Sequence, residues 1–314
     1  MLDDCTLFTI KKPSWQQVKH PILIKNNIDL WLCHLQTRPA QLSGNKWLKL
    51  KHHIAKVKAE HKHGIVTFGG AFSNHIAAVA AACAQLGLKS LTYLRADSVD
   101  LNNPTIQFCL QHGMRFHLLN RAEYRLRNDD TFCQVITNSH PELLLVAEGG
   151  SSSEGAKGVA ELNLTDTPNG KASLVALATA SGGTLAGVIT ANKSQVLGIA
   201  AVKDSSIADR VKQLLPQEVN ATSWSINMDY TDAGYAKFSP ELLAFCREMA
   251  SYNVHVEPIY SGKALYGLFK LIEQGQLNKH KRICFFHTGG LQGLDGLLYR
   301  NLISANDYKI LMGG

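Results

Sequence analysis

The chain has 314 residues and a mass of 34.4 kDa, which is enough to bury a large core that we expect to divide into two domains. Hydrophobic residues make up 45% and charged residues 18%, an ordinary balance for a globular α/β enzyme. The net charge of +7 does not indicate nucleic-acid binding, because the lysines gather on one predicted helix without interleaved aromatic residues.

Short apolar runs alternate with helical patterns along most of the chain. We expect strands at residues 65–68, 91–94, 116–119, 143–146, 174–178, 196–200 and 283–286. Helices are expected between them, at residues 75–86, 104–111, 129–138, 207–215 and 240–252. This alternation predicts an α/β fold with two open, mainly parallel sheets, flanking helices and right-handed crossovers.

The compartment and the relation to membranes follow from two further patterns. The seven cysteines lack CxxC pairs and metal-ligand spacing, and residues 1–4 lack the layout of a signal peptide, so we expect no metal and a cytoplasmic location. Residues 172–192 carry no charge, but the Ser181–Thr184 loop interrupts them. We therefore expect a buried strand, a loop and a helix there, not a membrane span.

Three polar glycine loops follow predicted strands, at residues 69–74, 181–184 and 288–290. In open parallel sheets, ligands bind at the carboxyl ends of the strands, so these loops can converge on one ligand if two sheets face a shared cleft. Any one of them alone is more simply explained as a tight turn that glycine permits.

A lysine, Lys46, follows Ser43, Gly44 and Asn45 on a tight polar turn at the start of a helical pattern. A lysine held by a turn can carry an aldehyde cofactor as a Schiff base. A glycine-rich turn that opens a helix can hold a phosphate on backbone N–H groups and the positive end of the helix dipole. Pyridoxal phosphate (PLP) needs both features, so the combination predicts this cofactor.

Five motifs, in this order, carry a resemblance to a known family: SGNKWLKL, GGAFSNHIAAVAA, ASGGTLAGV, EPIYSGKALYG and FFHTGG. Over about residues 42–290 the chain resembles the 1-aminocyclopropane-1-carboxylate deaminase/D-cysteine desulfhydrase family. These are fold-type II PLP-dependent enzymes, distantly related to tryptophan synthase β chains. We expect a large PLP-binding domain of residues 1–54 plus 159–314, a small inserted domain of residues 55–158, and a homodimer.

The resemblance implies that Lys46 forms the Schiff base with PLP, with a lysine pKa lowered by its surroundings. Lys49 and Lys51, further along the same helix, are expected to face solvent. The remaining cofactor contacts implied by the resemblance are Asn45, Asn74 at the phenolic oxygen, Ser181, Gly182, Gly183 and Thr184 at the phosphate, and Thr288 at the pyridine nitrogen.

The same resemblance places the amino-acid substrate at the start of the helix that follows residue 72. Ser73, Asn74 and His75 would bind it, with Ser73 and His75 meeting its carboxylate. Tyr260 matches an active-site tyrosine that transfers a proton or activates the nucleophile, so Lys46, Ser73 and Tyr260 form the expected catalytic set. A second tyrosine, Tyr235, falls near another family tyrosine. A helix-capping or solvent-facing His75 and an ordinary packed Tyr235 remain alternatives.

Two positions bear on the reaction. Deaminases of the family resemble one another in carrying a glutamate after the active-site tyrosine, where this chain has Ser261; Thr288 instead matches a hydroxyl of the desulfhydrases. We therefore expect α,β-elimination on D-cysteine or a related β-substituted amino acid, giving pyruvate, ammonia and sulfide. Alternatives are 1-aminocyclopropane-1-carboxylate deamination, amino-acid racemisation or dehydration, and non-catalytic PLP binding. Phe72, and residues 120–128 with their three arginines, depart from the family pattern.

Overall fold

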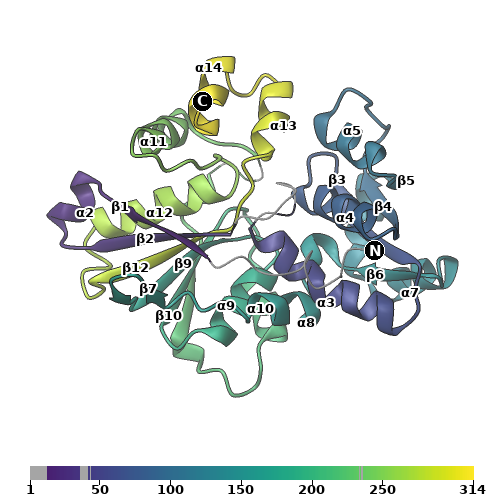
Figure 1. The fold of residues 1–314 in the computed structure, drawn as a ribbon, viewed down its shortest axis with the longest axis horizontal. Helices are drawn as coiled ribbons and strands as arrows, with labels where there is room; N and C mark the ends of the chain where they lie inside the picture. Colours follow the sequence, from purple (N-terminus) through teal and green to yellow (C-terminus); the bar gives the residue numbers. More distant parts are fainter. Residues whose placement is uncertain (1–12, 36–41, 43, 233, 235) are drawn as a thin grey trace.

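The computed structural model describes residues 13–35, 42, 44–232, 234 and 236–314, which form two main sheets side by side (Figure 1). The larger sheet contains, in spatial order, β1 (Ser14–Val18), β2 (Asp29–His34), β12 (Arg282–His287), β9 (Leu174–Thr179), β10 (Gln195–Ala200) and β11 (Trp224–Asn227). The smaller sheet contains β5 (Arg115–Leu119), β4 (Lys89–Arg95), β3 (Gly64–Gly70) and β6 (Leu143–Val146). Within these two sheets every pair is parallel except β1 with β2, which confirms the predicted fold class.

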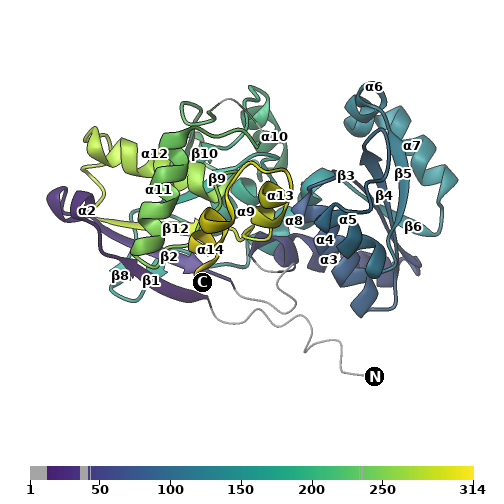
Figure 2. The ribbon, with the colours of Figure 1, turned by 90° about the horizontal axis from the view of Figure 1, so that it is seen from above.

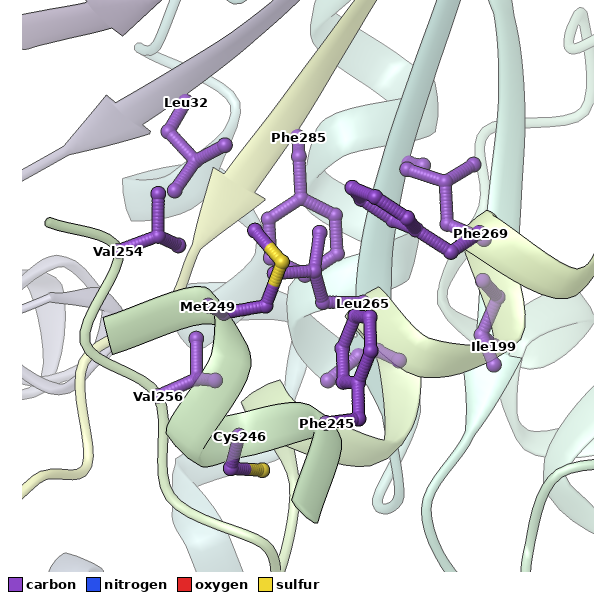
Figure 3. Packing of buried hydrophobic residues seen from close by; sticks show 14 of the residues in the cluster. Leu32, Ile199, Phe245, Cys246, Met249, Val254, Val256, Leu265, Phe269 and Phe285 are labelled. Atoms are coloured by element: carbon purple, nitrogen blue, oxygen red, sulfur yellow. The ribbon is translucent and has the colours of Figure 1, made fainter. Parts of the chain in front are cut away.

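Both faces of the larger sheet are buried. Alternate residues of β9 point to opposite faces, so Ala176 joins one apolar cluster and Leu177 the other. One face is covered by α2 (Pro21–Lys25), α11 (Pro240–Ser251), α12 (Ser261–Glu273), α13 (Gly293–Tyr299) and α14 (Ala305–Met312). The other face is covered by α8 (Ser153–Val159), α9 (Gly183–Ala191) and α10 (Ile207–Leu214). Figure 3 shows the first cluster, in which Phe245, Met249 and Phe285 pack between the helices and the strands.

The smaller sheet is covered on one face by α3 (Asn45–Ala59), α4 (Asn74–Gln85) and α5 (Pro104–Gln111), and on the other by α6 (Arg121–Arg125) and α7 (Asp130–Ser139). The helix α3 belongs to both parts of the molecule. Its Leu48 packs into the core beneath the larger sheet, whereas Trp47 and Leu50 pack against the smaller one. Figure 2 shows the two parts side by side, with α3 and α8 near the junction. The residues that α3 carries are therefore held from two sides.

Every strand and helix for which we predicted bounds is present, within a few residues. The uncharged stretch at 172–192 contains β9 and α9, and none of the helices described is long and apolar enough to cross a membrane. Elements without predicted bounds include β1, β2, β11 and a short antiparallel pair, β7 (Asp166–Thr167) and β8 (Gly170–Lys171). The division at 54/55 and 158/159 stays a proposal, and its first boundary falls inside α3.

Candidate active site

The start of α3 is held against the end of β12. Gly44, the residue before the helix, has φ +70°, and a Cβ added to it would lie 2.1 Å from the carbonyl oxygen of Thr288. The backbone N–H of Asn45 donates to the same oxygen at 3.2 Å. Only glycine allows this approach, because any side chain would clash with that carbonyl. This contact with the Thr288 carbonyl places Lys46, in the first turn of α3, beside the loop that follows β12.

The amine of Lys46 is poised between charged and neutral forms. Its Nζ donates to Asn45 Oδ1 at 2.8 Å, and burial lowers its pKa to about 8 although the carboxylate of Glu257 opposes the shift. A fraction of the amine is therefore neutral near physiological pH, the form that attacks an aldehyde. Asn45 also donates from Nδ2 to Thr184 Oγ1 at 2.7 Å, which ties the Lys46 turn to α9.

The start of α9, with the loop before it, is positively polarised. Gly182 caps the helix in the left-handed region, at φ +91°, and Gly183 and Thr184 are buried. The first N–H groups of a helix lack partners within the helix, and the dipole there favours an anion. Lys49 adds a basic amine, because a Cβ added to Gly183 would lie 3.3 Å from Lys49 Nζ. This helix start therefore has the donors that a phosphate requires.

The prediction that Lys49 faces solvent is wrong, since only 2% of this residue is exposed. Lys49 lies three residues after Lys46 on α3, so both point to the same side of the helix. Burial, followed by the charge of Lys46, lowers the pKa of Lys49 to about 7. Lys51, by contrast, lies nearer the surface, where it pairs with Glu161.

The expected substrate residues lie at the start of α4. Ser73 caps this helix, with its Oγ accepting from the His75 N–H at 3.2 Å, and Ser73 and Asn74 are both partly exposed. A Cβ on Gly290 would lie 3.5 Å from Asn74 Nδ2, so the glycine loops after β3 and β12 meet at Asn74.

The His75 ring is buried, and its Nε2 lies 2.8 Å from Thr67 Oγ1. Burial and the nearby lysines hold the pKa of His75 well below its usual range. The imidazole is therefore neutral and supplies no positive charge to a substrate carboxylate.

A buried carboxylate lies behind Tyr260 at the start of α12. Glu257 is fully buried, and it accepts the Tyr260 N–H at 3.0 Å, the Ser261 N–H at 2.8 Å and the Ser261 hydroxyl at 2.9 Å. Burial raises its pKa to about 7, and these hydrogen bonds oppose the rise. Glu257 Oε1 also lies 3.5 Å from the Cβ position of Gly290, at the edge of the site. The Ser261 hydroxyl is thus engaged with an acid. Tyr235 lies outside the described residues.

Residues 21–289 match the model of a family described as pyridoxal-phosphate dependent enzyme. The chain belongs to this family. Its cofactor is therefore PLP, in agreement with a lysine of lowered pKa whose turn contacts the glycine-capped start of α9.

Two curated relatives and one solved structure show which members of the family this chain is similar to. The PLP enzyme is 30% identical to the bifunctional D-cysteine desulfhydrase/1-aminocyclopropane-1-carboxylate deaminase, mitochondrial, of Arabidopsis thaliana, over 86% of this chain and 74% of that protein. It is 27% identical to the D-cysteine desulfhydrase of Klebsiella pneumoniae (strain 342), over 82% of this chain and 85% of that one. A crystal structure of an ACC (1-aminocyclopropane-1-carboxylate) deaminase homologue has the same fold, with a TM-score of 0.76 and 21% sequence identity. The match covers 97% of this chain and 95% of that chain. The family resemblance predicted from the motifs is confirmed.

Two departures from the family pattern have structural roles in this PLP enzyme. Phe72 packs on α13, since a Cβ on Gly296 would lie 2.7 Å from its ring, so it links the two parts of the molecule. Within residues 120–128, Arg127 donates to Glu148 at 2.5 Å and lies over the ring of Tyr124, which donates to the same carboxylate. This cluster fixes the loop after β6, in which the Ser151 hydroxyl donates to the Ser181 carbonyl oxygen at 3.0 Å, just before α9.

Proposed function

We propose that the protein is a carbon–sulfur lyase that converts D-cysteine, or a related β-substituted amino acid, to pyruvate, ammonia and sulfide. The observation that carries the proposal is the setting of Lys46. Its amine has a pKa of about 8, and its turn contacts both the start of α9, through Asn45, and the loop after β12. The curated relatives named for this reaction support the same substrate class.

The residues of the site fit PLP at both ends. Lys49 and the N-terminus of α9 would hold the phosphate, and Lys46 would bind the aldehyde carbon. Asn74 would donate to the phenolic oxygen. When bound, PLP withdraws electrons from the Cα of an amino acid, which makes the proton on that carbon acidic.

The chain's own groups would then handle the substrate and its protons. The Ser73 hydroxyl and the first turn of α4 would hold the carboxylate, where the helix dipole favours an anion. The neutral amine of Lys46 would take the α-proton. Tyr260, partly exposed at the start of α12, would hold a proton at its phenolic oxygen for the departing thiolate.

The environment of the pyridine nitrogen favours elimination of a good leaving group. Position 261 is a serine, not the glutamate expected of a deaminase, and Thr288 lies beside the Lys46 turn. A second candidate is 1-aminocyclopropane-1-carboxylate deamination. It is favoured by Glu257, because this buried acid accepts a hydrogen bond from the Ser261 hydroxyl and so brings a carboxylate close to that position.

A product screen tests these alternatives. Purified protein saturated with PLP is incubated with D- and L-cysteine, D- and L-serine and the cyclopropane amino acid, and sulfide, pyruvate and 2-oxobutyrate are measured. We expect sulfide and pyruvate from D-cysteine faster than 2-oxobutyrate from the cyclopropane substrate. Faster 2-oxobutyrate formation would establish the deaminase instead, and PLP binding without any turnover would favour a carrier.

The Lys46→Ala variant is the control for the screen, since it should retain no borohydride-reducible PLP after dialysis. A reduced adduct at Lys49 or Lys51 would contradict the assignment of Lys46.

We further propose a cytoplasmic homodimer. A reducing compartment is supported by the six cysteines of the described ranges, all of which are free. Sedimentation of the purified protein tests the dimer.

A further inference from the structure

A third buried lysine, besides Lys46 and Lys49, has no part in the chemistry described so far. Lys263 lies in the first turn of α12, and none of its surface is exposed. Its Nζ donates to three backbone carbonyl oxygens, those of Gly234 at 2.7 Å, Thr231 at 2.9 Å and Ala201 at 3.2 Å. A buried ammonium group with only carbonyl partners is costly unless every donor is used.

The geometry requires the charged form of this lysine. Burial lowers the pKa of Lys263, whereas the carboxylates of Asp232 and Glu257 raise it. A neutral amine has two N–H groups and a lone pair, so one of the three carbonyls would face the lone pair without a proton. An ammonium group has three donors and satisfies all three oxygens. The three carbonyl partners therefore require the charged form of Lys263, although burial favours the neutral form.

The three carbonyls belong to two segments that lie far from α12 in the sequence. Ala201 follows β10, and its N–H donates to Thr179, the last residue of β9 before the phosphate loop. Thr231 and Gly234 belong to the segment between β11 and α11. Lys263 itself is fixed to α12, whose first turn begins directly after Tyr260. One ammonium group thus joins the phosphate side of the site to its tyrosine side.

We propose that Lys263 is a positioning residue that acts as a built-in monovalent cation, holding the segments around Ala201 and Thr231 against the start of α12. This inference rests on the proposed function in one respect, namely that the segments held by Lys263 surround the active site of the lyase. Backbone carbonyl oxygens are also the ligands that replace water around K⁺. If the lysine side chain is shortened, the carbonyl cluster should therefore accept an external cation of similar size.

Chemical rescue tests the proposal. Lys263→Ala deletes the atoms of propylamine, and we expect kcat with D-cysteine and the affinity for PLP to fall about tenfold or more, as for the loss of charge-assisted hydrogen bonds. Propylammonium, or ammonium, should restore both, whereas choline chloride at the same ionic strength should not. Lys263→Met keeps the stem, leaves no room for a cation and should not be rescued.

The matched control is Lys270→Ala in the same helix, where the side chain is 38% exposed and pairs with Glu273 at 2.8 Å. This variant should behave like the wild type and show no response to added cations. An unchanged Lys263→Ala would overturn the proposal. So would a loss in that variant that no cation repairs although the protein still binds PLP.

A measurement on the wild type keeps the proposal testable if Lys263→Ala does not fold. In protein labelled with ¹⁵N-lysine, a buried ammonium group with three carbonyl partners should give a slowly exchanging NH₃⁺ signal at pH 8 that Lys263→Met lacks. Absence of that signal would overturn the proposal. Because this readout needs no substrate, it stands apart from the lyase assay, whose failure would refute the proposed function alone.

Discussion

Replacing Lys49 by methionine should have opposite effects on the protein without PLP and with it. Without the cofactor, Lys49 is a buried amine beside the start of α9, with a pKa lowered from 10.5 to about 7. Methionine fills a similar volume and carries no charge. With PLP bound, the same amine lies where the phosphate is expected, and its charge becomes favourable.

The size of each effect follows from the pKa and from the contact. At pH 8 the unfolded chain keeps the lysine proton and the folded cofactor-free protein loses it. Lys49 therefore lowers the free energy of unfolding of the cofactor-free protein by an amount on the order of 3 kcal/mol. Cofactor-free Lys49→Met should gain a large part of that stability. With PLP, loss of one buried charge-assisted contact should weaken binding by about 10- to 150-fold.

The pH dependence carries a defined sign. Between about pH 7 and 10.5 the unfolded chain holds a proton on Lys49 that the folded chain lacks, so this group makes the cofactor-free wild type more stable as pH rises. Lys49→Met should lack this contribution.

Urea unfolding of the cofactor-free proteins and spectroscopic titration with PLP provide the measurements. Lys51→Met is the control, because Lys51 pairs with Glu161 near the surface and should change little. A cofactor-free Lys49→Met less stable than the wild type, or one that binds PLP with undiminished affinity, would refute the reasoning.

Three further predictions concern the neighbouring groups. Glu257→Gln should lower the pKa of Lys46 below about 8, because the carboxylate that favours its charged form is lost; the pH dependence of Lys46 acylation in cofactor-free protein checks this, and an unshifted profile would count against it. Ser261→Glu would set a second carboxylate beside Glu257 and should cost about 3 kcal/mol or more in urea unfolding, increasingly as pH rises, whereas Ser261→Ala should cost about 1 kcal/mol. Gly44→Ala places a Cβ 2.1 Å from a carbonyl oxygen, so it should lower Tm and PLP content; Gly87→Ala, with a similar φ of +65° but open space, should retain full PLP content.

The sequence predicted the fold well where local signals and burial agree. The helix α5 has Asn103 as its cap and Pro104 in its first turn, and β6 is a short apolar run, so both bounds are as predicted. The strand β1, with the sequence SWQQV, lacks such a signal. It lies at the edge of the sheet and pairs with β2 alone, so its partner, not its own pattern, defines it as a strand.

The candidate site was predictable where its groups lie in contiguous motifs and less so where they act through burial. Lys46 and the loop at Gly183 stood out because turn and helix start are adjacent in the sequence. The spacing of Lys49 from Lys46 placed both on one face of the helix, a signal that was available. Glu257 and Lys263 stand in a motif with ordinary composition. Their importance comes from contacts with distant segments, which no local pattern reveals.

The contact between Gly44 and the carbonyl of Thr288 also determines when the site can form during synthesis. The turn that carries Lys46 is made long before the strand that fixes it, because β12 (Arg282–His287) comes far later in the chain. Domains generally fold from the N-terminus as the chain is made, yet this turn must wait until β12 has inserted between β2 and β9. Capture of the cofactor therefore cannot precede the synthesis of β12, and the nascent chain carries its reactive lysine unassembled until then.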